Sequence, residues 1–296
     1  MAAAVAAAVS LSVLAGLLSD GAWPWVVATY LRWPQVVAIT AATVALAITG
    51  WWRSAVPAAI VTAALAGTVA APLGALETVP AAERATLRVA VFNTGARNTD
   101  VAEVAEAVAA ARADVAVMLE SEDIAGPLDR RLDGLSRLPT PIDGPMMSAP
   151  VVLARRDWPV EVVPLGDGVR PVAVVSAEIG GRPIDIVAFH PLPPVTRDWT
   201  RRHDLAMRRV IEVLPREDPS VLACDCNAAP WTPSMERLLD AGLRGPSVVP
   251  TFVAPLIGLP IDHVLLGDRV AAVSRELGPF AGSDHRLIVT EVILDG

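Results

Sequence analysis

Eight polar side chains with catalytic chemistry stand at the ends or starts of strand-like apolar runs. They are Asn93, Glu120, His190, Asp225, Asn227, Asp262, Asp284 and His285. The densest group lies in VLACDCNAAPW (residues 221–231), where an acid and an amide are two residues apart. Carboxylate and imidazole groups transfer protons, and carboxylate and amide oxygens bind cations. Because strand ends bring groups together from distant parts of a chain, the set predicts one catalytic cleft.

Each of these residues also has an ordinary structural explanation. Asn93 and Asn227 are common turn formers. Glu120 has the position of a solvated strand end, and His190 precedes a proline in a loop-like segment. These explanations stay open for single residues, but the repetition of polar groups at strand boundaries favours a functional interpretation of the whole set.

The elements that would position these residues begin at residue 87. Apolar runs predict strands at LRVAVFN, ADVAVMLE, PVVLARR, PVAVVSAEIG, RPIDIVAFH, SVLACDCN, PIDHVLLG and HRLIVTEVIL. DVAEVAEAVAAAR has helical spacing with Asp100 at its start, and helices are also predicted at residues 201–213 and 234–239. The alternation of strands and helices indicates an α/β domain.

The region before residue 77 is much less polar. Its charged residues are Asp20, Arg32 and Arg53. They divide three apolar runs, at residues 2–18, 36–52 and 55–76. Each run is close to the roughly 17 to 25 residues that cross a bilayer as a helix, and tryptophans near the run ends suit the headgroup level.

We therefore expect three regions. They are a membrane domain with three transmembrane helices (1–76), a linker (77–86) and a soluble domain (87–296). A cleaved signal peptide is an alternative for the first run, although no basic segment precedes it. A buried helical core is a second alternative, but it would need to hide three nearly uncharged helices.

Six motifs resemble one superfamily in their order along the chain. VFNTGARN, DVAVMLE, FHPLPP, DCN, IDHV and GSDHR resemble the endonuclease/exonuclease/phosphatase superfamily, whose fold is that of DNase I. The resemblance covers residues 87–293 and implies an α/β fold of four layers, with two packed mixed β-sheets flanked by helices. The apolar prefix and HPLPP are most similar to the membrane-anchored bacterial branch.

The resemblance implies a metal site on one side of the cleft. Glu120 matches the metal-binding glutamate, Asn93 the asparagine beside it, and Asp284 the aspartate that completes the metal side. Such oxygen donors suit Mg²⁺, with Mn²⁺ as the alternative, when water and phosphate supply the other ligands.

The resemblance also implies catalytic roles. His285 matches the histidine at the scissile phosphate, and Asp262 the carboxylate that fixes its tautomer. Asp225 matches the residue that orients or deprotonates the attacking water, and His190 the histidine that stabilises developing charge. Asn227 would donate to a phosphoryl oxygen, since on an extended chain it points to the same side as Asp225.

The remaining histidines and the cysteines are expected to lie outside the chemistry. His263 should face away from Asp262 on its strand and be structural, and His203 should lie on a solvated helix face. Cys224 and Cys226 are too close on an extended chain for an ordinary disulfide, and without a second pair they are a poor zinc site. The family usually has glycine and a hydrophobic residue at these two positions.

Charge favours a small or lipid-borne substrate. The formal net charge is −8, and the negative excess lies after residue 86, so the chain gains little from phosphate neutralisation on nucleic acid. The leading prediction is a metal-dependent hydrolase of phosphodiesters or phosphomonoesters. A membrane-tethered nuclease and a catalytically silent binding module are the alternatives.

The predicted location is the cell membrane, with several spans. Each short loop of the apolar region holds one arginine, so the charge rule barely discriminates the two orientations. Arg53 lies in the shorter loop and indicates the cytoplasmic side slightly better than Arg32 does. Together with the resemblance, this places the catalytic domain on the extracytoplasmic side.

Overall fold

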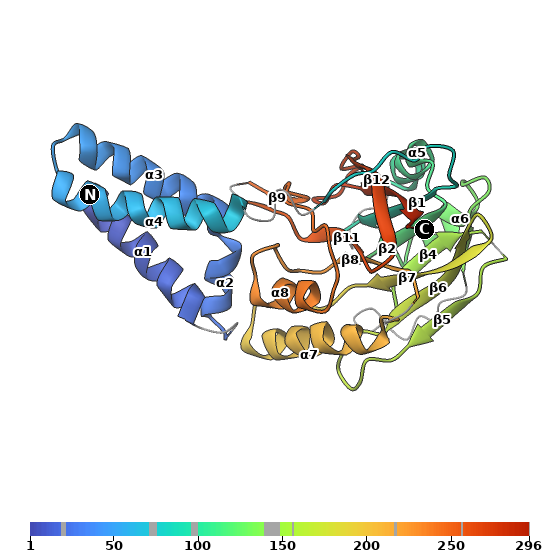
Figure 1. The fold of residues 1–296 in the computed structure, drawn as a ribbon. Helices are drawn as coiled ribbons and strands as arrows, with labels where there is room; N and C mark the ends of the chain where they lie inside the picture. Colours follow the sequence, from blue (N-terminus) through green and yellow to red (C-terminus); the bar gives the residue numbers. More distant parts are fainter. Residues whose placement is uncertain are drawn as a thin grey trace.

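The computed structural model describes residues 1–18, 22–70, 76–95, 100–138, 149–155, 157–215, 218–255 and 257–295. A group of helices, here named the helical unit, projects from one end of a β-sandwich (Figure 1). The helical unit consists of α1 (Ala2–Leu18), α2 (Trp25–Tyr30), α3 (Arg32–Ile48) and α4 (Trp52–Ala70).

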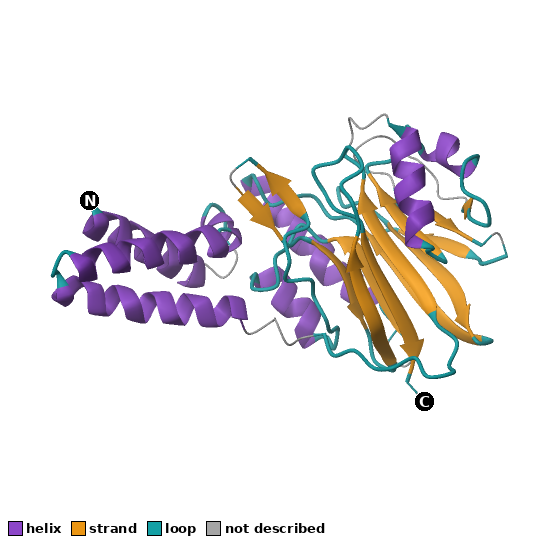
Figure 2. Cartoon of the chain, turned by 90° about the horizontal axis from the view of Figure 1, so that it is seen from above, coloured by secondary structure: helices purple, strands orange, loops and turns teal. Residues whose placement is uncertain are grey.

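The sandwich contains two large mixed sheets. The first has the strand order β12 (Val270–Leu277), β13 (Ile288–Leu294), β1 (Leu87–Asn93), β2 (Val115–Leu119), β4 (Val151–Ala154), β3 (Ser136–Arg137). The second has the order β11 (Asp262–Leu266), β8 (Ser220–Asp225), β7 (Arg182–Phe189), β6 (Val172–Ile179), β5 (Val160–Val163). A separate hairpin of β9 (Phe252–Ala254) and β10 (Ile257–Leu259) lies between the sandwich and the helical unit (Figure 2).

Three apolar layers hold the sandwich together. Alternate residues of β1, β2, β7 and β8, such as Val91, Val117, Ile186 and Ala223, form the core between the two sheets. The opposite faces of these strands pack against helices, because nearly all their residues are apolar. The first sheet is covered by α5 (Val101–Ala111) and α6 (Ala125–Asp129), and the second by α7 (Arg197–Val213) and α8 (Pro233–Asp240). The result is the expected order of helix, sheet, sheet and helix.

The strand directions bring the polar ends to one edge. β1 is parallel to β2, and β7 is parallel to β8, so each pair places its carboxyl ends side by side. β11 runs antiparallel to β8, and its first residue, Asp262, lies opposite the last residue of β8, Asp225. The two sheets therefore present five strand ends or starts to a common region.

The expectation of three membrane spans is supported for one helix. Among the described residues, α4 (19 residues) alone has the length and apolar composition to cross a bilayer, and Ala2–Leu14 and Arg32–Ile48 are shorter apolar helices. The second apolar run does not continue to Trp52, since α3 ends at Ile48 and Gly50 has a positive φ of 78° that breaks the helix. The third run begins its helix at Trp52 and ends it at Ala70.

Candidate active site

The structure gathers the predicted polar residues at the edge described above. Asn93 ends β1, Glu120 follows β2, His190 follows β7, Asp225 ends β8, Asp262 begins β11, and Asn227, Asp284 and His285 lie in the loops after β8 and before β13. Two of them turn sharply, because Glu120 (φ 52°) and Asn227 (φ 45°) have left-handed backbone conformations. Most non-glycine residues adopt this conformation rarely, although asparagine does so more readily than the others.

Asn93 links two of the carboxylates. Its Nδ2 donates to Asp225 Oδ2 at 2.9 Å and to Glu120 Oε1 at 3.4 Å. Its Oδ1 accepts from the backbone N–H of Gly95 at 3.0 Å, which fixes the orientation of the amide. Asn93 therefore presents its NH₂ group, and not its oxygen, to the two acids.

His285 and Asp262 form a buried pair. His285 Nδ1 lies 2.9 and 3.1 Å from the two oxygens of Asp262, which is completely buried. Burial lowers the pKa of His285, but the hydrogen bond and charge of Asp262, with the charges of Asp225 and Asp284, raise it to about 9. His285 is thus cationic at neutral pH, with Nε2 at 3.9 Å from Asp225 Oδ2.

Asp225 has the electrostatic character of a proton acceptor. Burial and the neighbouring charge of Asp262 raise its pKa to about 7, against the opposing effects of His285 and the hydrogen bonds from Asn93 and Asn227. A carboxylate that titrates near neutral pH can take a proton from water and release it again. Asn93, His190 and His285 each place a nitrogen within 3.9 Å of Asp225 Oδ2.

Arg170 belongs to the site, although the sequence analysis missed it. Its Nη1 lies 2.7 Å from His190 Nδ1. A guanidinium is a donor only, so Nδ1 accepts and the ring proton is on Nε2. That nitrogen faces Glu120 Oε1 and Asp225 Oδ2, each at 3.7 Å. Burial, Arg170 and His285 together hold the pKa of His190 well below its usual range. No spacing in GVRP (residues 168–171) signals this contact, which only the three-dimensional structure reveals.

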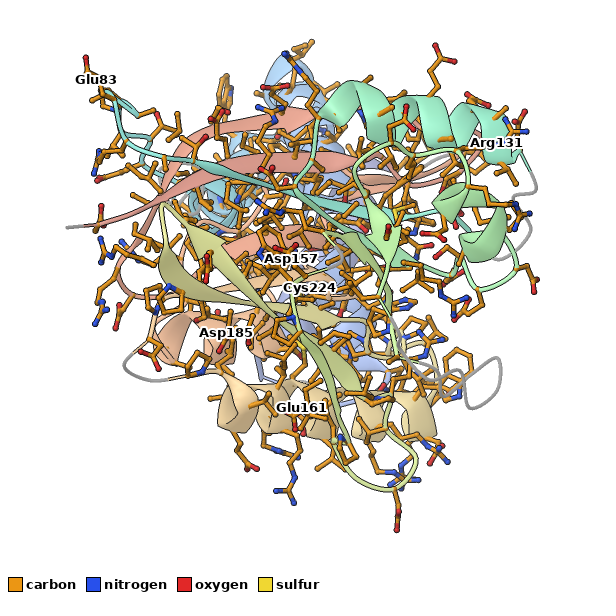
Figure 3. The ribbon with its side chains drawn as sticks, turned by 90° about the vertical axis from the view of Figure 1, so that its right-hand side faces the viewer. Glu83, Arg131, Asp157, Glu161, Asp185 and Cys224 are labelled. Atoms are coloured by element: carbon orange, nitrogen blue, oxygen red, sulfur yellow. A yellow bond between two sulfur atoms is a disulfide. The ribbon has the colours of Figure 1, made fainter. Side chains whose placement is uncertain are left out.

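The segment after β8 differs from the extended chain that we expected. Cys226 and Asn227 lie beyond the strand, and the Cα atoms of Cys224 and Cys226 come within 5.0 Å, a separation that permits the disulfide seen here. The expectation that these cysteines cannot form a bridge was wrong, because the chain turns after Asp225. Figure 3 shows Cys224 in the interior, whereas Glu83 and Arg131 lie at the periphery.

The turn also determines the direction of the Asn227 side chain. Its backbone N–H donates to Asp225 Oδ1 at 3.0 Å, and its Nδ2 donates to the carbonyl of Pro191 at 3.1 Å. The side chain is thus directed by this turn and not by strand alternation. One hydrogen of Nδ2 has no partner among the described residues.

Asp284 lies on the rim of the site. It is exposed, and its Oδ1 is 3.7 Å from the position that a Cβ would take on Gly95. Asp284 and Glu120, whose side chain is 34% exposed, are the most accessible acids of the predicted set. They form the side of the site that water reaches.

The two remaining histidines are both buried. His263 accepts from the backbone N–H of Ser247 and donates from Nε2 to the carbonyl of Ala228, on the face away from Asp262 as expected. His203 is 1% exposed, so its expected place on a solvated helix face was wrong. It lies on the apolar face of α7 and its Nδ1 donates to the carbonyl of Leu192 at 2.9 Å.

Burial of His203 should make the protein less stable in acid. Burial lowers the pKa of His203 to about 4. As pH falls, the unfolded chain therefore binds a proton at this histidine near pH 6.5, whereas the folded chain binds it only near pH 4. Stability from this group is present above pH 6.5 and is lost as pH falls. Between pH 7 and 5 the loss should be about 2 kcal/mol.

Urea titrations at both pH values would measure this loss. His203→Asn keeps a donor for Leu192 but does not titrate, so its free energy of unfolding should decline less between the two pH values. Equal declines for both proteins would contradict the prediction.

Comparison with known proteins now identifies the family. Residues 90–285 match the model of the Endonuclease/Exonuclease/phosphatase family. The chain belongs to this family. The match includes all eight predicted residues, and it confirms the resemblance to the superfamily but does not test the resemblance to its membrane-anchored branch. Comparison with curated proteins gives no match.

Solved structures show the same DNase I-like fold. A family member from Beutenbergia cavernae DSM 12333 is 20% identical, with a TM-score of 0.59 and 72% of each chain covered. D. rerio TDP2 complexed with a single-strand DNA product is 14% identical, with a TM-score of 0.54 and coverage of 70% of this chain and 99% of that one. Sphingomyelinase C from Streptomyces griseocarneus is 18% identical, with a TM-score of 0.51 and coverage of 70% and 99%.

Proposed function

We propose that this family member is a divalent-metal-dependent phosphoester hydrolase that its helical unit attaches to a membrane. The observation that carries the proposal is the packing of the His285–Asp262 pair against Asp225, which is held in turn by Asn93. A cationic imidazole and a carboxylate that titrates near neutral pH are paired in one buried cluster. This is the arrangement that acid–base hydrolysis needs.

The accessible acids fit a hard cation. Glu120 and Asp284 would hold Mg²⁺ or Mn²⁺ with water in the other positions, since both ions prefer oxygen ligands. Asn93 would orient Glu120, and its Oδ1 keeps one lone pair beside the Gly95 N–H for the ion. When bound, the ion supplies Lewis-acid polarisation of a phosphoryl oxygen.

A second cluster is a competing metal site. Asp225, Asp262 and His285 offer ligand atoms that all lie within 4.8 Å of one another. The geometry argues against it, because both oxygens of Asp262 contact Nδ1 of His285 and leave only Nε2 of that ring for an ion. We assign Asp225 and His285 to proton transfer, with Asp262 as the support of His285.

Side chains of the protein would carry out the proton transfers and bind the phosphoryl oxygens. Asp225 would take a proton from the attacking water as the oxygen–phosphorus bond forms. His285, supported by Asp262, would give its Nε2 proton to the leaving oxygen as the ester bond breaks, and the proton held by Asp225 would then restore the cationic imidazole. The Nε2–H of His190 and the available hydrogen of Asn227 would donate to other phosphoryl oxygens.

The packing of the helical unit supports membrane attachment. One internal cluster of the helical unit consists of Ala6, Ala42, Ala55, Ala58 and Leu46, and the larger side chains of Ile39 and Leu65 are also buried. Other large apolar side chains point outward, including Leu11 (67% exposed), Ile48 (79%) and Ile60 (65%). Small residues at helix contacts and large apolar side chains on the outer surface are typical of helices packed in lipid. The exposed Trp51 and Trp52 at the α3–α4 turn suit a membrane interface.

Substrate assays would test the proposed class. The net charge of −8 favours a small or lipid-borne phosphoester over nucleic acid. We expect the full chain to hydrolyse phospholipid head groups or model diesters faster than plasmid DNA or RNA. Activity on nucleic acid should be low and show no steep dependence on salt.

Rapid cleavage of plasmid at physiological salt would contradict this substrate class and favour the membrane-tethered nuclease. The similarity to TDP2, which has been solved with a DNA product, keeps that alternative open. A folded chain with no activity on the whole panel would contradict the proposed hydrolase itself.

A further inference from the structure

We propose that Tyr30 of the helical unit is a positioning residue of the active site, where it holds the backbone of Asn227. The inference rests on the proposed function, in which Asn227 donates to a phosphoryl oxygen. It makes the helical unit part of the catalytic structure as well as an anchor.

Two hydrogen bonds join α2 to the loop that follows β8. The hydroxyl of Tyr30 donates to the carbonyl of Asn227 at 2.5 Å. Nε1 of Trp231 donates to the carbonyl of Thr29 at 2.7 Å. Tyr30 is 8% and Trp231 4% exposed. Consecutive residues of α2 therefore hold both ends of the segment from residue 227 to residue 231.

Apolar packing shields these bonds from water. Val26, Tyr30 and Val69 of the helical unit pack with Ala229, Trp231 and Ile261 of the sandwich. Trp33 stands edge-on to Trp231, with ring centroids 6.4 Å apart. A hydrogen bond that water cannot reach is stronger and harder to replace than an exposed one. Loss of the Tyr30 hydroxyl would leave the Asn227 carbonyl without its observed donor.

The orientation of Asn227 depends on such external contacts. Asn227 has a left-handed backbone conformation, which asparagine tolerates better than most residues, and its contacts with the rest of the protein keep it there. The carbonyl of the next residue, Ala228, accepts from His263 Nε2 at 2.8 Å. The turn is thus held from the sandwich by His263 and from the helical unit by Tyr30. Removal of either donor should let the Asn227 amide move away from the phosphate.

The same contact region reaches the catalytic histidine. Phe252 of β9 packs against the apolar cluster of Tyr30 and Trp231, and its ring lies 5.0 Å from the ring of His285. The helical unit therefore borders the site at two points, Asn227 directly and His285 through Phe252. A shift of α2 against the sandwich would therefore displace groups that take part in the reaction.

A double-mutant cycle on the full chain in detergent would test the inference. We expect Tyr30→Phe to lower kcat about 10-fold with little change in KM, a value at the upper end for one hydrogen bond. Because Tyr30 acts through Asn227, Tyr30→Phe should add nothing to the loss caused by Asn227→Ala. Trp231→Phe removes the neighbouring bond of the same interface and should affect kcat less.

An amide spectrum separates this inference from the proposed function. The chain has three asparagines, at residues 93, 98 and 227, so selective ¹⁵N-asparagine labelling gives few signals to assign. Tyr30→Phe should shift the signals of Asn227, whether or not a substrate is known.

Unchanged Asn227 signals, or kcat losses that add in the double variant, would overturn the positioning role of Tyr30. If the Asn227 signals shift but Asn227→Ala hydrolyses its substrate normally, the contact stands and the proposed role of Asn227 in the chemistry fails.

Discussion

His285→Ala should lower kcat by about 10³-fold or more while the protein stays folded. The imidazole is a cationic donor that faces Asp225, and general acid–base groups of this kind contribute roughly 10²- to 10⁴-fold. Alanine also leaves Asp225 and Asp262 as two buried carboxylates without the cation between them. The measurement is kcat at saturating metal, with circular dichroism to show that the fold is retained.

Asp262→Asn tests the supporting role of Asp262 while His285 itself stays in place. The amide keeps the size of the side chain but removes the charge that helps to raise the pKa of His285. We expect a loss of about 100-fold in kcat, smaller than that of His285→Ala. His203→Asn, which alters a buried histidine of α7 outside the site, is the matched control and should leave kcat unchanged.

The outcome that would contradict this assignment is specific. If a substitution of His263 lowered kcat more than His285→Ala, the catalytic histidine would lie on the opposite face of β11. His263 contacts Ser247 and Ala228, so its replacement is expected to act through stability and loop position.

The sequence predicted the elements whose pattern is strong and local. LRVAVFN coincides with β1 (Leu87–Asn93), and Asp100 caps α5 by accepting from the N–H of Glu103, as helix-start signals indicate. The strands with a continuous apolar run were found because both of their faces are buried. β12 (Val270–Leu277) was missed, since its burial is mixed and it carries Ser274, Arg275 and Glu276. β5 (Val160–Val163) is short and partly exposed, and it gave no periodic signal either.

The grouping of the site residues was predictable, but their partners were not. Position at a strand end follows from apolar patterning, and it located all eight residues. The direction of a side chain after the end of a strand depends on turns. Here the chain turns at Asn227, next to the Cys224–Cys226 disulfide, so the expectation that residues two apart point to the same side does not apply. Arg170 and Tyr30 are separated from their partners by 20 and 197 residues, and no local pattern encodes either contact.

Removal of divalent metal should abolish hydrolysis, and Glu120→Gln should weaken metal binding by about 100-fold. Glu120 is the partly exposed carboxylate that Asn93 orients, so its charge, together with that of Asp284, would attract a cation to the rim. EDTA should stop turnover, and Mg²⁺ or Mn²⁺ should restore it. Asp123→Asn, at an exposed acid three residues along the chain, is the control and should leave metal affinity unchanged.

Titration of the protein with Mn²⁺, monitored by electron paramagnetic resonance, measures metal binding independently of turnover. Comparison of variants then shows which residues hold the ion. If Asp225→Asn weakened Mn²⁺ binding and Glu120→Gln did not, the ion would belong to the cluster of Asp225, Asp262 and His285. His285 would then have to be a neutral ligand, and its role as a cationic donor would be excluded. Hydrolysis that continues in EDTA would reject the metal-dependent mechanism, because the protein groups alone would then suffice for the reaction.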